Sequence, residues 1–178
     1  MRKSCGRAVH RVDADRVRTD SRLLQIAPCR NEDLPSLAVL LELSPEAASW
    51  SVSALREALG SQPRHFLVAW QDQQIVGFIC GRRIDDQGEI LNLAVDGSFR
   101  RRGVGSALVR GLLARLDREG VARVFLEVRF SNTRAMRFYR SLQFRQVAER
   151  PDYYRNPSES AWVLACALPG SDRTARTV

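Results

Sequence analysis

Apolar residues recur at the three- and four-residue spacing of an amphipathic helix in four stretches of the chain, at residues 34–41, 52–59, 104–116 and 135–142. Residues that favour helix N-termini precede three of these stretches, namely Asn31-Glu32-Asp33, Ser51, and either Ser131 or Asn132. Gly60 and Gly120 follow the second and third stretches, where glycine can end a helix. The pattern therefore predicts four helices.

Between these stretches, short apolar runs bounded by polar residues and turn formers predict strands. We expect them at 22–28, 66–70, 75–80, 89–95, 124–128, 145–149 and 161–168. The polar run 71–74 between the second and third strands is typical of a hairpin, so the sheet begins antiparallel. In the second half of the chain a helix lies between two strands. The whole order predicts an α/β fold in which helices pack on a mixed sheet.

Length and composition place this pattern in a single folded domain. The chain has 178 residues, of which 44% are hydrophobic and 27% are charged, as is ordinary for a globular protein. We expect a flexible basic leader at 1–20, the domain at 21–168 and a polar tail at 169–178. No apolar run approaches the roughly 20 residues that cross a bilayer, and the leader lacks the apolar segment of a secretory signal. These features predict a cytoplasmic protein with no membrane partner.

The net charge of +8 raises the question of a nucleic-acid partner. Residues 1–30 carry most of this excess, so the basic character belongs mainly to the leader. A solvated arm and an RNA-contacting arm both fit it, although the sequence has no aromatic and basic signature of an RNA-binding domain. The cysteines lie far apart, at Cys5, Cys29, Cys80 and Cys166, and with two histidines they do not have the spacing of metal ligands. We expect free thiols and no metal.

A basic segment that contains two glycines follows the predicted strand 89–95 and opens the next helix. It reads Arg100-Arg101-Arg102-Gly103-Val104-Gly105-Ser106. Free backbone N–H groups and the helix dipole favour an anion such as pyrophosphate at such a helix start. Leu108 stands where a dinucleotide-binding loop needs its third glycine, and the Gly-Lys-Ser/Thr of an ATP-type loop is absent. The segment predicts a phosphate-binding loop of another kind, or a helix that simply begins with glycines.

The residues around this segment carry a resemblance to a known family. Asn92-Leu93-Ala94-Val95-Asp96, followed by the run from Arg100 to Gly105, is similar to the cofactor motif of the GCN5-related N-acetyltransferases (GNAT). The resemblance implies a mostly antiparallel sheet flanked by helices, in which two parallel strands splay apart to bind acetyl-CoA. It implies that backbone groups of Leu93, Ala94 and Val95 contact the pantetheine arm and the acetyl oxygen. The pyrophosphate would then lie at Arg101, Arg102, Gly103, Val104, Gly105 and Ser106.

A second motif is more specific. The residues Leu126-Glu127-Val128-Arg129, Ser131-Asn132, Ala135 and Phe138-Tyr139 resemble the bacterial ribosomal-protein-alanine branch of that family. The resemblance implies that Glu127 is the general base, that Tyr139 is the general acid, and that Asn132 contacts CoA. By strand alternation alone, Glu127 shares a mixed face with Phe125, where a carboxylate can be catalytic or merely solvated. Tyr139 lies on an apolar helical stripe, where a tyrosine is often part of the core.

Three positions depart from the pattern of the relatives. Gln143 stands where they have glycine after the helix, so a left-handed residue there would cost about 1 kcal/mol. Glu159-Ser160-Ala161 replaces an acidic pair before alanine, which bears on acceptor recognition. Trp50 precedes Ser51 as in relatives but lacks their preceding residues, and we interpret it as a packing residue.

The leading hypothesis is direct acetyl transfer from acetyl-CoA to the N-terminal α-amine of a ribosomal protein that begins with alanine. An α-amine has a pKa near 7.7–8.0 and a lysine near 10.4, so forming the neutral nucleophile at pH 7 costs about 3 kcal/mol less for a chain terminus. One carboxylate could do this without a metal or a covalent intermediate. The alternatives are a small amine such as a polyamine or aminoglycoside, a lysine side chain, and an RNA-binding protein without catalysis.

Overall fold

The computed structural model describes residues 23–61 and 64–170, so the predicted leader and most of the predicted tail lie outside the described residues. The elements are β1 Gln25–Pro28, a 3₁₀ turn at Asn31–Asp33, α1 Leu34–Glu42, α2 Val52–Gly60, β2 Arg64–Gln71, β3 Gln74–Ile84, β4 Gln87–Val95, a 3₁₀ turn at Gly97–Phe99, α3 Val104–Arg118, β5 Arg123–Arg129, α4 Thr133–Ser141, β6 Arg145–Arg155 and β7 Ser158–Ala167. Within these ranges no helix is long and apolar enough to cross a membrane. The four predicted helices and the mixed α/β fold are confirmed.

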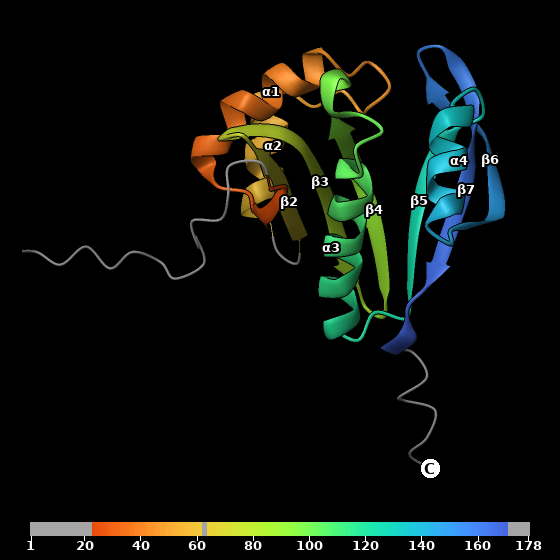
Figure 1. Ribbon diagram of the computed structural model, residues 1–178. Helices are drawn as coiled ribbons and strands as arrows, with labels where there is room; N and C mark the ends of the chain where they lie inside the picture. The colour runs from red at the N-terminus through yellow and green to blue at the C-terminus, as the bar shows by residue number, and fades with distance from the viewer. Residues whose placement is uncertain (1–22, 62–63, 171–178) are drawn as a thin grey trace, which may run out of the picture.

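The described strands form one seven-stranded sheet in the order β1-β2-β3-β4-β5-β7-β6. Neighbouring strands are antiparallel except for β4 and β5, which are parallel because α3 crosses between them. This parallel ladder joins only residues 87–89 to residues 123–125. Beyond it the two strands diverge, and Figure 1 shows the gap widening toward their carboxyl ends. The predicted splayed pair is therefore present.

A β-bulge in β4 accompanies this divergence. Gly81 of β3 pairs with Ile90, whereas the adjacent Cys80 pairs with Asn92, so Leu91 is an extra residue in β4. A bulge bends its strand and increases the local twist. Because this bulge lies two residues after the last pair between β4 and β5, we attribute the widening gap to it.

Helices cover both faces of the sheet. α1 and α2 bury Leu37 and Leu55 against one face. α3 and α4 bury Leu112 and Met136 against the other, where Figure 1 shows α3 in front of β3 and β4, and α4 in front of β5 to β7. α3 lies close to β3 because Gly81 has no side chain, since a Cβ there would lie 2.7 Å from Leu112 Cδ2. α3 and α4, the helices that follow β4 and β5, therefore lie on the same face of the sheet.

Helix starts follow the sequence signals in two cases out of three. The Ser51 hydroxyl accepts a hydrogen bond from Ala54 N–H at 3.2 Å, and Asn132 Oδ1 accepts one from Ala135 N–H at 2.9 Å. Asn132, rather than Ser131, therefore caps α4. Asp33 stands at the N-cap of α1, within the predicted residues 31–33, but its side chain makes no cap hydrogen bond to that helix. Residues 31–33 form a separate 3₁₀ turn in which Asp33 accepts a hydrogen bond from Arg30 N–H at 2.8 Å.

The last two predicted strands were too short. The prediction ended one at 149, whereas β6 continues to Arg155, and it began the other at 161, whereas β7 begins at Ser158. β6 is an edge strand exposed along almost its whole length, so it has no alternation of apolar and polar residues to mark it. Pro151 is compatible with such an edge, where one N–H can be lost from the ladder.

Candidate functional site

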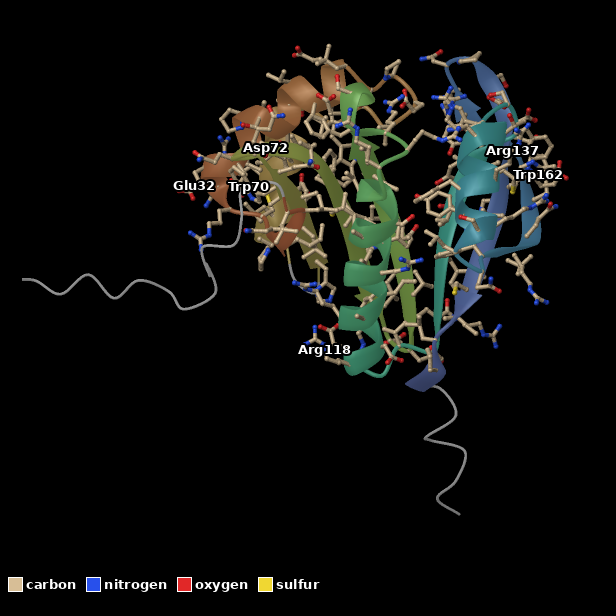
Figure 2. The ribbon with its side chains drawn as sticks, in the orientation of Figure 1. Glu32, Trp70, Asp72, Arg118, Arg137 and Trp162 are labelled. Atoms are coloured by element: carbon tan, nitrogen blue, oxygen red, sulfur yellow. The ribbon has the colours of Figure 1, made fainter. Side chains whose placement is uncertain are left out.

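The wide end of the gap between β4 and β5 receives the N-termini of two helices. α3 begins at Val104 and α4 at Thr133, each soon after one of these strands ends. Because β4 and β5 are parallel, their carboxyl ends lie at the same edge of the sheet. Figure 2 labels Arg118 at the opposite end of α3, far from this edge. Two adjoining cavities lie at the wide end.

The first cavity, which we call the α3 cavity, has a volume of about 360 Å³. The end of β4, the loop before α3, the first turn of α3 and one side of α4 line it. Most of the residues predicted to bind acetyl-CoA are among its lining: Leu93, Ala94, Val95, Arg101, Gly103, Val104, Gly105, Ser106 and Asn132. Arg102 is not among the lining residues, and its guanidinium carbon lies 5.4 Å from the centre of the Phe99 ring.

The start of α3 presents backbone N–H groups to this cavity. The first intrahelical bond runs from Ala107 N–H to the Gly103 carbonyl at 2.9 Å, so the amides of residues 104–106 precede it. Gly103 has a φ of +85° at the N-cap, a left-handed conformation that glycine adopts without strain. Gly105 allows α4 to approach, because a Cβ there would lie 3.2 Å from Phe138 Cζ. The arrangement suits an anionic group.

The second cavity, which we call the β5 cavity, has a volume of about 500 Å³. Its walls come from the α1–α2 loop at residues 45–49, from β4 and β5, from α4, and from Tyr154 and Asn156 at the β6–β7 hairpin. Both predicted catalytic residues, Glu127 and Tyr139, line it. The two cavities share the lining residues Glu46, Leu93, Asn132, Ala135 and Phe138. A ligand in one cavity would thus reach the other at β4.

Glu127 lies on β5 and faces away from the core formed by its neighbours Leu126 and Val128, as strand alternation predicts. Its side chain is 13% exposed, and its Oε1 lies 3.1 Å from Nη1 of Arg150. Burial raises the pKa of this carboxyl above its usual value, while the charge of Arg150 acts in the opposite direction. A carboxylate with a raised pKa beside a cavity is a candidate for a general base.

Tyr139 lies on α4 with its ring in edge-to-face contact with Phe138 and Phe144. The residue is buried, and burial raises the pKa of its hydroxyl above the usual value. The hydroxyl therefore stays protonated at neutral pH and can act as a proton donor. The ring belongs to the core and the residue also lines the β5 cavity, so the core position is confirmed and the role as general acid stays a prediction.

Glu159 ties the β6–β7 hairpin to the residues that precede α4. Its carboxylate accepts hydrogen bonds from the Ser131 amide and, at 3.1 Å, from the Ser131 hydroxyl, and it lies 3.2 Å from Arg129 Nη1. The guanidinium carbon of Arg129 lies 3.9 Å from the centre of the Tyr154 ring. The hydrogen bonds from Ser131 lower the pKa of Glu159. Where the relatives have an acidic pair, this chain thus keeps one acidic residue, Glu159, which stabilises a wall of the β5 cavity.

The sequence analysis missed the residues that hold the α1–α2 loop. Asn92 is 4% exposed, accepts a hydrogen bond from Ala48 N–H at 3.2 Å, and donates one to the Ala48 carbonyl at 2.9 Å. Glu46 of the same loop forms an ion pair with Arg100, whose Nε donates to the Val95 carbonyl at 3.0 Å. A polar residue at an inward-facing position of an apolar strand was the available signal for Asn92. Trp50, interpreted as a packing residue, is indeed partly buried against the α1–α2 core.

Comparison with known proteins identifies the family. A model of the acetyltransferase (GNAT) family matches residues 31–144. The chain belongs to this family. It is 31% identical over 144 residues to the [ribosomal protein bS18]-alanine N-acetyltransferase of Escherichia coli (strain K12), covering 81% of this chain and 96% of that one. It is also 34% identical over 119 residues to the N-alpha-acetyltransferase RimI of Mycobacterium tuberculosis (strain ATCC 25618 / H37Rv), covering 65% and 73%.

Solved GNAT structures have the same fold. The crystal structure of the Escherichia coli ribosomal-protein-S18-alanine N-acetyltransferase matches with a TM-score of 0.72 and 27% identity, over 82% of this chain and 94% of that one. Ard1 from Thermoplasma volcanium matches with a TM-score of 0.75 and 29% identity, over 82% and 97%. This GNAT chain is therefore an acetyl-CoA-dependent N-acetyltransferase.

The lining of the α3 cavity fits the co-substrate that the GNAT family uses. Its helix start offers amides to phosphate oxygens, Arg101 adds positive charge, and Leu93, Val95 and Phe138 supply apolar surface for an alkyl chain. The described residues contain no group of three or more side chains of the types that could hold a metal ion. Side chains that line the β5 cavity, together with nearby backbone groups, are the candidates for the chemistry.

Proposed function

We propose that this acetyltransferase transfers the acetyl group of acetyl-CoA to the N-terminal α-amine of a protein, and that its substrate is a ribosomal protein that begins with alanine. The names of the relatives support the acceptor, since several of them act on ribosomal protein bS18 by name. The observation that carries the proposal is that Glu127 lies on the wall of a cavity adjoining the α3 cavity.

Acetyl-CoA would lie in the α3 cavity. The amides of residues 104–106 would bind its pyrophosphate, with Arg101 adding charge, and backbone groups of residues 93–95 would bind the arm and the acetyl oxygen. Asn132 uses its Oδ1 to cap α4, so its amide nitrogen would make the contact to CoA. When bound, this co-substrate supplies a thioester with an electrophilic carbonyl carbon and a thiolate leaving group.

Glu127 would remove the proton from the acceptor amine, directly or through one water molecule. Its raised pKa makes it a stronger base than an ordinary carboxylate, and its position on β5 directs it into the β5 cavity. An α-amine needs little help, because a pKa near 7.7–8.0 leaves about a tenth or more of it neutral at pH 7.

Tyr139 would give its proton to the departing thiolate. Burial raises the pKa of its hydroxyl, which keeps the proton in place until the thiolate forms but makes transfer to a thiolate of ordinary pKa near 8.5 uphill. The tyrosinate would therefore be reprotonated at once, with the proton that Glu127 removed from the amine, so that free CoA thiol leaves and both side chains return to their starting states. The rest of the acceleration would come from holding the amine and the thioester together at the junction of the two cavities.

Mass spectrometry of acetyl transfer onto a panel of acceptors tests the proposal. The panel contains alanine-starting peptides with free N-termini, the same peptides N-blocked but carrying a lysine, and polyamines. We expect acetylation of the free N-termini. Products confined to lysine or polyamines would overturn the α-amine proposal while leaving the enzyme class intact. The extension to a ribosomal protein is tested with intact 30S proteins from the source organism as acceptors.

A further inference from the structure

Glu127 belongs to a row of four charged residues between β3 and β6, in which two acidic residues lie between two arginines. Arg82 on β3 lies 2.6 Å from Glu89 on β4, and Arg150 on β6 lies 3.1 Å from Glu127 on β5. The charges of Glu89 and Arg82 also act on Glu127. The mechanism proposed above uses Glu127 and leaves the role of its ion-pair partner open.

Arg150 reaches Glu127 across a strand that lies between them. In the sheet order β5-β7-β6, Glu127 pairs with Val163 of β7, and Arg150 pairs with Ala161 two residues earlier on the same strand. These two β7 side chains are small enough for the guanidinium to extend over them. The Arg150 guanidinium carbon also lies 5.4 Å from the centre of the Tyr153 ring.

We propose that Arg150 is a specificity-determining residue whose guanidinium repels acceptors that arrive as ammonium ions, so that the site favours a neutral α-amine over a lysine side chain or a polyamine. This inference deepens the proposed function and rests on it, because it takes Glu127 as the group that the acceptor amine approaches.

Exposure places Arg150 on the solvent side of the pair. The Glu127 side chain is 13% exposed, whereas that of Arg150 is 55% exposed. An amine within hydrogen-bonding distance of the Glu127 carboxylate therefore also lies within a few ångströms of the guanidinium. Like charges at such distances repel, and this kind of repulsion is a common source of selectivity at binding sites.

The two classes of amine differ in how they meet this charge. A lysine side chain has a pKa near 10.4, so only about one in a thousand is neutral at pH 7.4, whereas about a quarter of α-amines are. If Arg150 disfavours the ammonium form, transfer depends on the neutral form. The rates for the α-amine and the lysine then differ in proportion to their neutral fractions. Without Arg150, the Glu127 carboxylate would attract ammonium ions and deprotonate them after they bind.

Other charged and titratable groups around Glu127 are engaged elsewhere. Arg129, two residues along β5 and in the lining of the β5 cavity, is paired with Glu159. Glu89 on β4 and Arg82 on β3 form their own ion pair, so their charges largely offset one another. Tyr153 and Tyr154 on β6 have pKa values raised by burial, to about 12 for Tyr154, and both are neutral in the physiological range. Arg150 is thus the cation paired with Glu127.

The test compares two matched peptides, one with a free N-terminal alanine and no lysine, the other N-acetylated with a single lysine. The ratio of kcat/KM values for the two peptides is measured with the wild-type enzyme, Arg150→Gln, Arg150→Lys, and the control Arg145→Gln, an exposed arginine on the same strand. We expect Arg150→Gln to lower the ratio of α-amine to lysine about tenfold, chiefly by a gain on the lysine peptide. Arg150→Lys and Arg145→Gln should keep the wild-type ratio.

A pH profile gives a second measurement, which would not change if the role of Arg150 were purely structural. Arg150 lowers the pKa of Glu127, so Arg150→Gln should shift the acidic limb of kcat, measured at saturating peptide, to higher pH. An unchanged ratio, or an equal loss on both peptides, would overturn the role of Arg150 while the wild-type preference for α-amines still stood. A wild-type enzyme that does not prefer the α-amine would instead overturn the proposed function itself.

Discussion

The two cavities at the gap between β4 and β5 are built in different ways. The α3 cavity is formed largely by consecutive residues, from the end of β4 through the first turn of α3, and its polar groups include the backbone amides of that turn. The β5 cavity is formed by side chains from segments far apart in the sequence, including the α1–α2 loop, β5, α4 and the β6–β7 hairpin. The first is suited to a co-substrate that every family member shares. The second carries the chemistry and the choice of acceptor.

Removing the Glu127 carboxylate should have the largest effect on the β5 cavity while leaving the α3 cavity unchanged. We expect Glu127→Gln to lower kcat/KM for an alanine-starting peptide about 10²–10⁴-fold, the usual contribution of a general base. Binding of acetyl-CoA, measured by calorimetry, should be unchanged because Glu127 does not line the α3 cavity.

The pH dependence of acetyl transfer gives a second test of Glu127. Burial raises the pKa of Glu127, and below that pKa the protonated carboxyl cannot accept a proton, so the wild-type kcat, measured at saturating peptide to remove the titration of the free amine, should fall as the pH drops through it. Glu127→Gln should lack this limb. Glu149→Gln, at an exposed position on β6, is the matched control and should behave as wild type. A full acidic limb in Glu127→Gln would assign the base to another residue.

Tyr139→Phe should have a smaller effect, about 10–100-fold on kcat, because the leaving thiolate can depart without a donor at some cost. The ring contacts with Phe138 and Phe144 are retained in this variant, so thermal unfolding should shift by only a few degrees. Single-turnover measurement of CoA release checks the rate. A loss confined to acceptor KM would show that the hydroxyl binds the acceptor instead of serving as the acid.

Gly105→Val tests the α3 cavity in turn. The new side chain would meet Phe138, whose Cζ lies 3.2 Å from the position of the first added carbon, and it would occupy space at the helix start. We expect acetyl-CoA to bind about tenfold more weakly, as measured by calorimetry. Gly97→Val is the control, because a Cβ at that position has no neighbouring atom within 4 Å. Equal affinities for the two variants would place the phosphates elsewhere.

Asn92→Ala should alter the β5 cavity by loosening the α1–α2 loop that forms one of its walls. The change removes both hydrogen bonds to Ala48 and leaves those backbone groups without their partner, which frees the α1–α2 loop. We expect KM for the acceptor peptide to rise about three- to tenfold with little change in KM for acetyl-CoA. Gln74→Ala, at an exposed position on β3, should change neither value. An equal rise in both KM values would show that the loop serves the two cavities together.

The smallest expected effect lies outside both cavities. Gln143 has a φ of +70°, so the left-handed residue predicted from the sequence occurs although the relatives' glycine is missing. Gln143→Gly should raise the free energy of unfolding by up to about 1 kcal/mol, which is roughly 2–4 °C in Tm for a domain of this size. Kinetic constants for both substrates should stay the same. A lowered Tm would mean that the Gln143 side chain contributes more than its backbone conformation costs.

The contrast between the cavities also explains what could be predicted from the sequence. The α3 cavity depends on residues close together in the chain, so a motif of a few residues was enough to place nine of the ten predicted co-substrate residues around one volume. The missed parts are long-range pairings. Nothing near Asn92 indicates that it bonds Ala48, 44 residues earlier, and nothing near Arg150 indicates that it reaches Glu127 across β7.

The fold shows the same division. Helices and buried strands carry apolar periodicity and were predicted, whereas β6 is exposed on both faces and was cut short at residue 149. The bulge at Leu91, on which the gap depends, has no glycine or proline to mark it. Residues 93–95 were implicated only through the family motif.

The short ladder between β4 and β5 has a consequence for amide hydrogen exchange. Among the described strands, β4 pairs with β5 only through residues 87–89, so the amides farther along β4 that face β5 have no strand partner to slow their exchange. A ligand lying along that edge would protect them in the middle of the sheet, where most proteins are already protected. At a concentration 100 times its Kd, such a ligand would also add about 2.7 kcal/mol to the stability of the folded state. The supply of acetyl-CoA in a cell would then affect how long this enzyme survives as well as how fast it works.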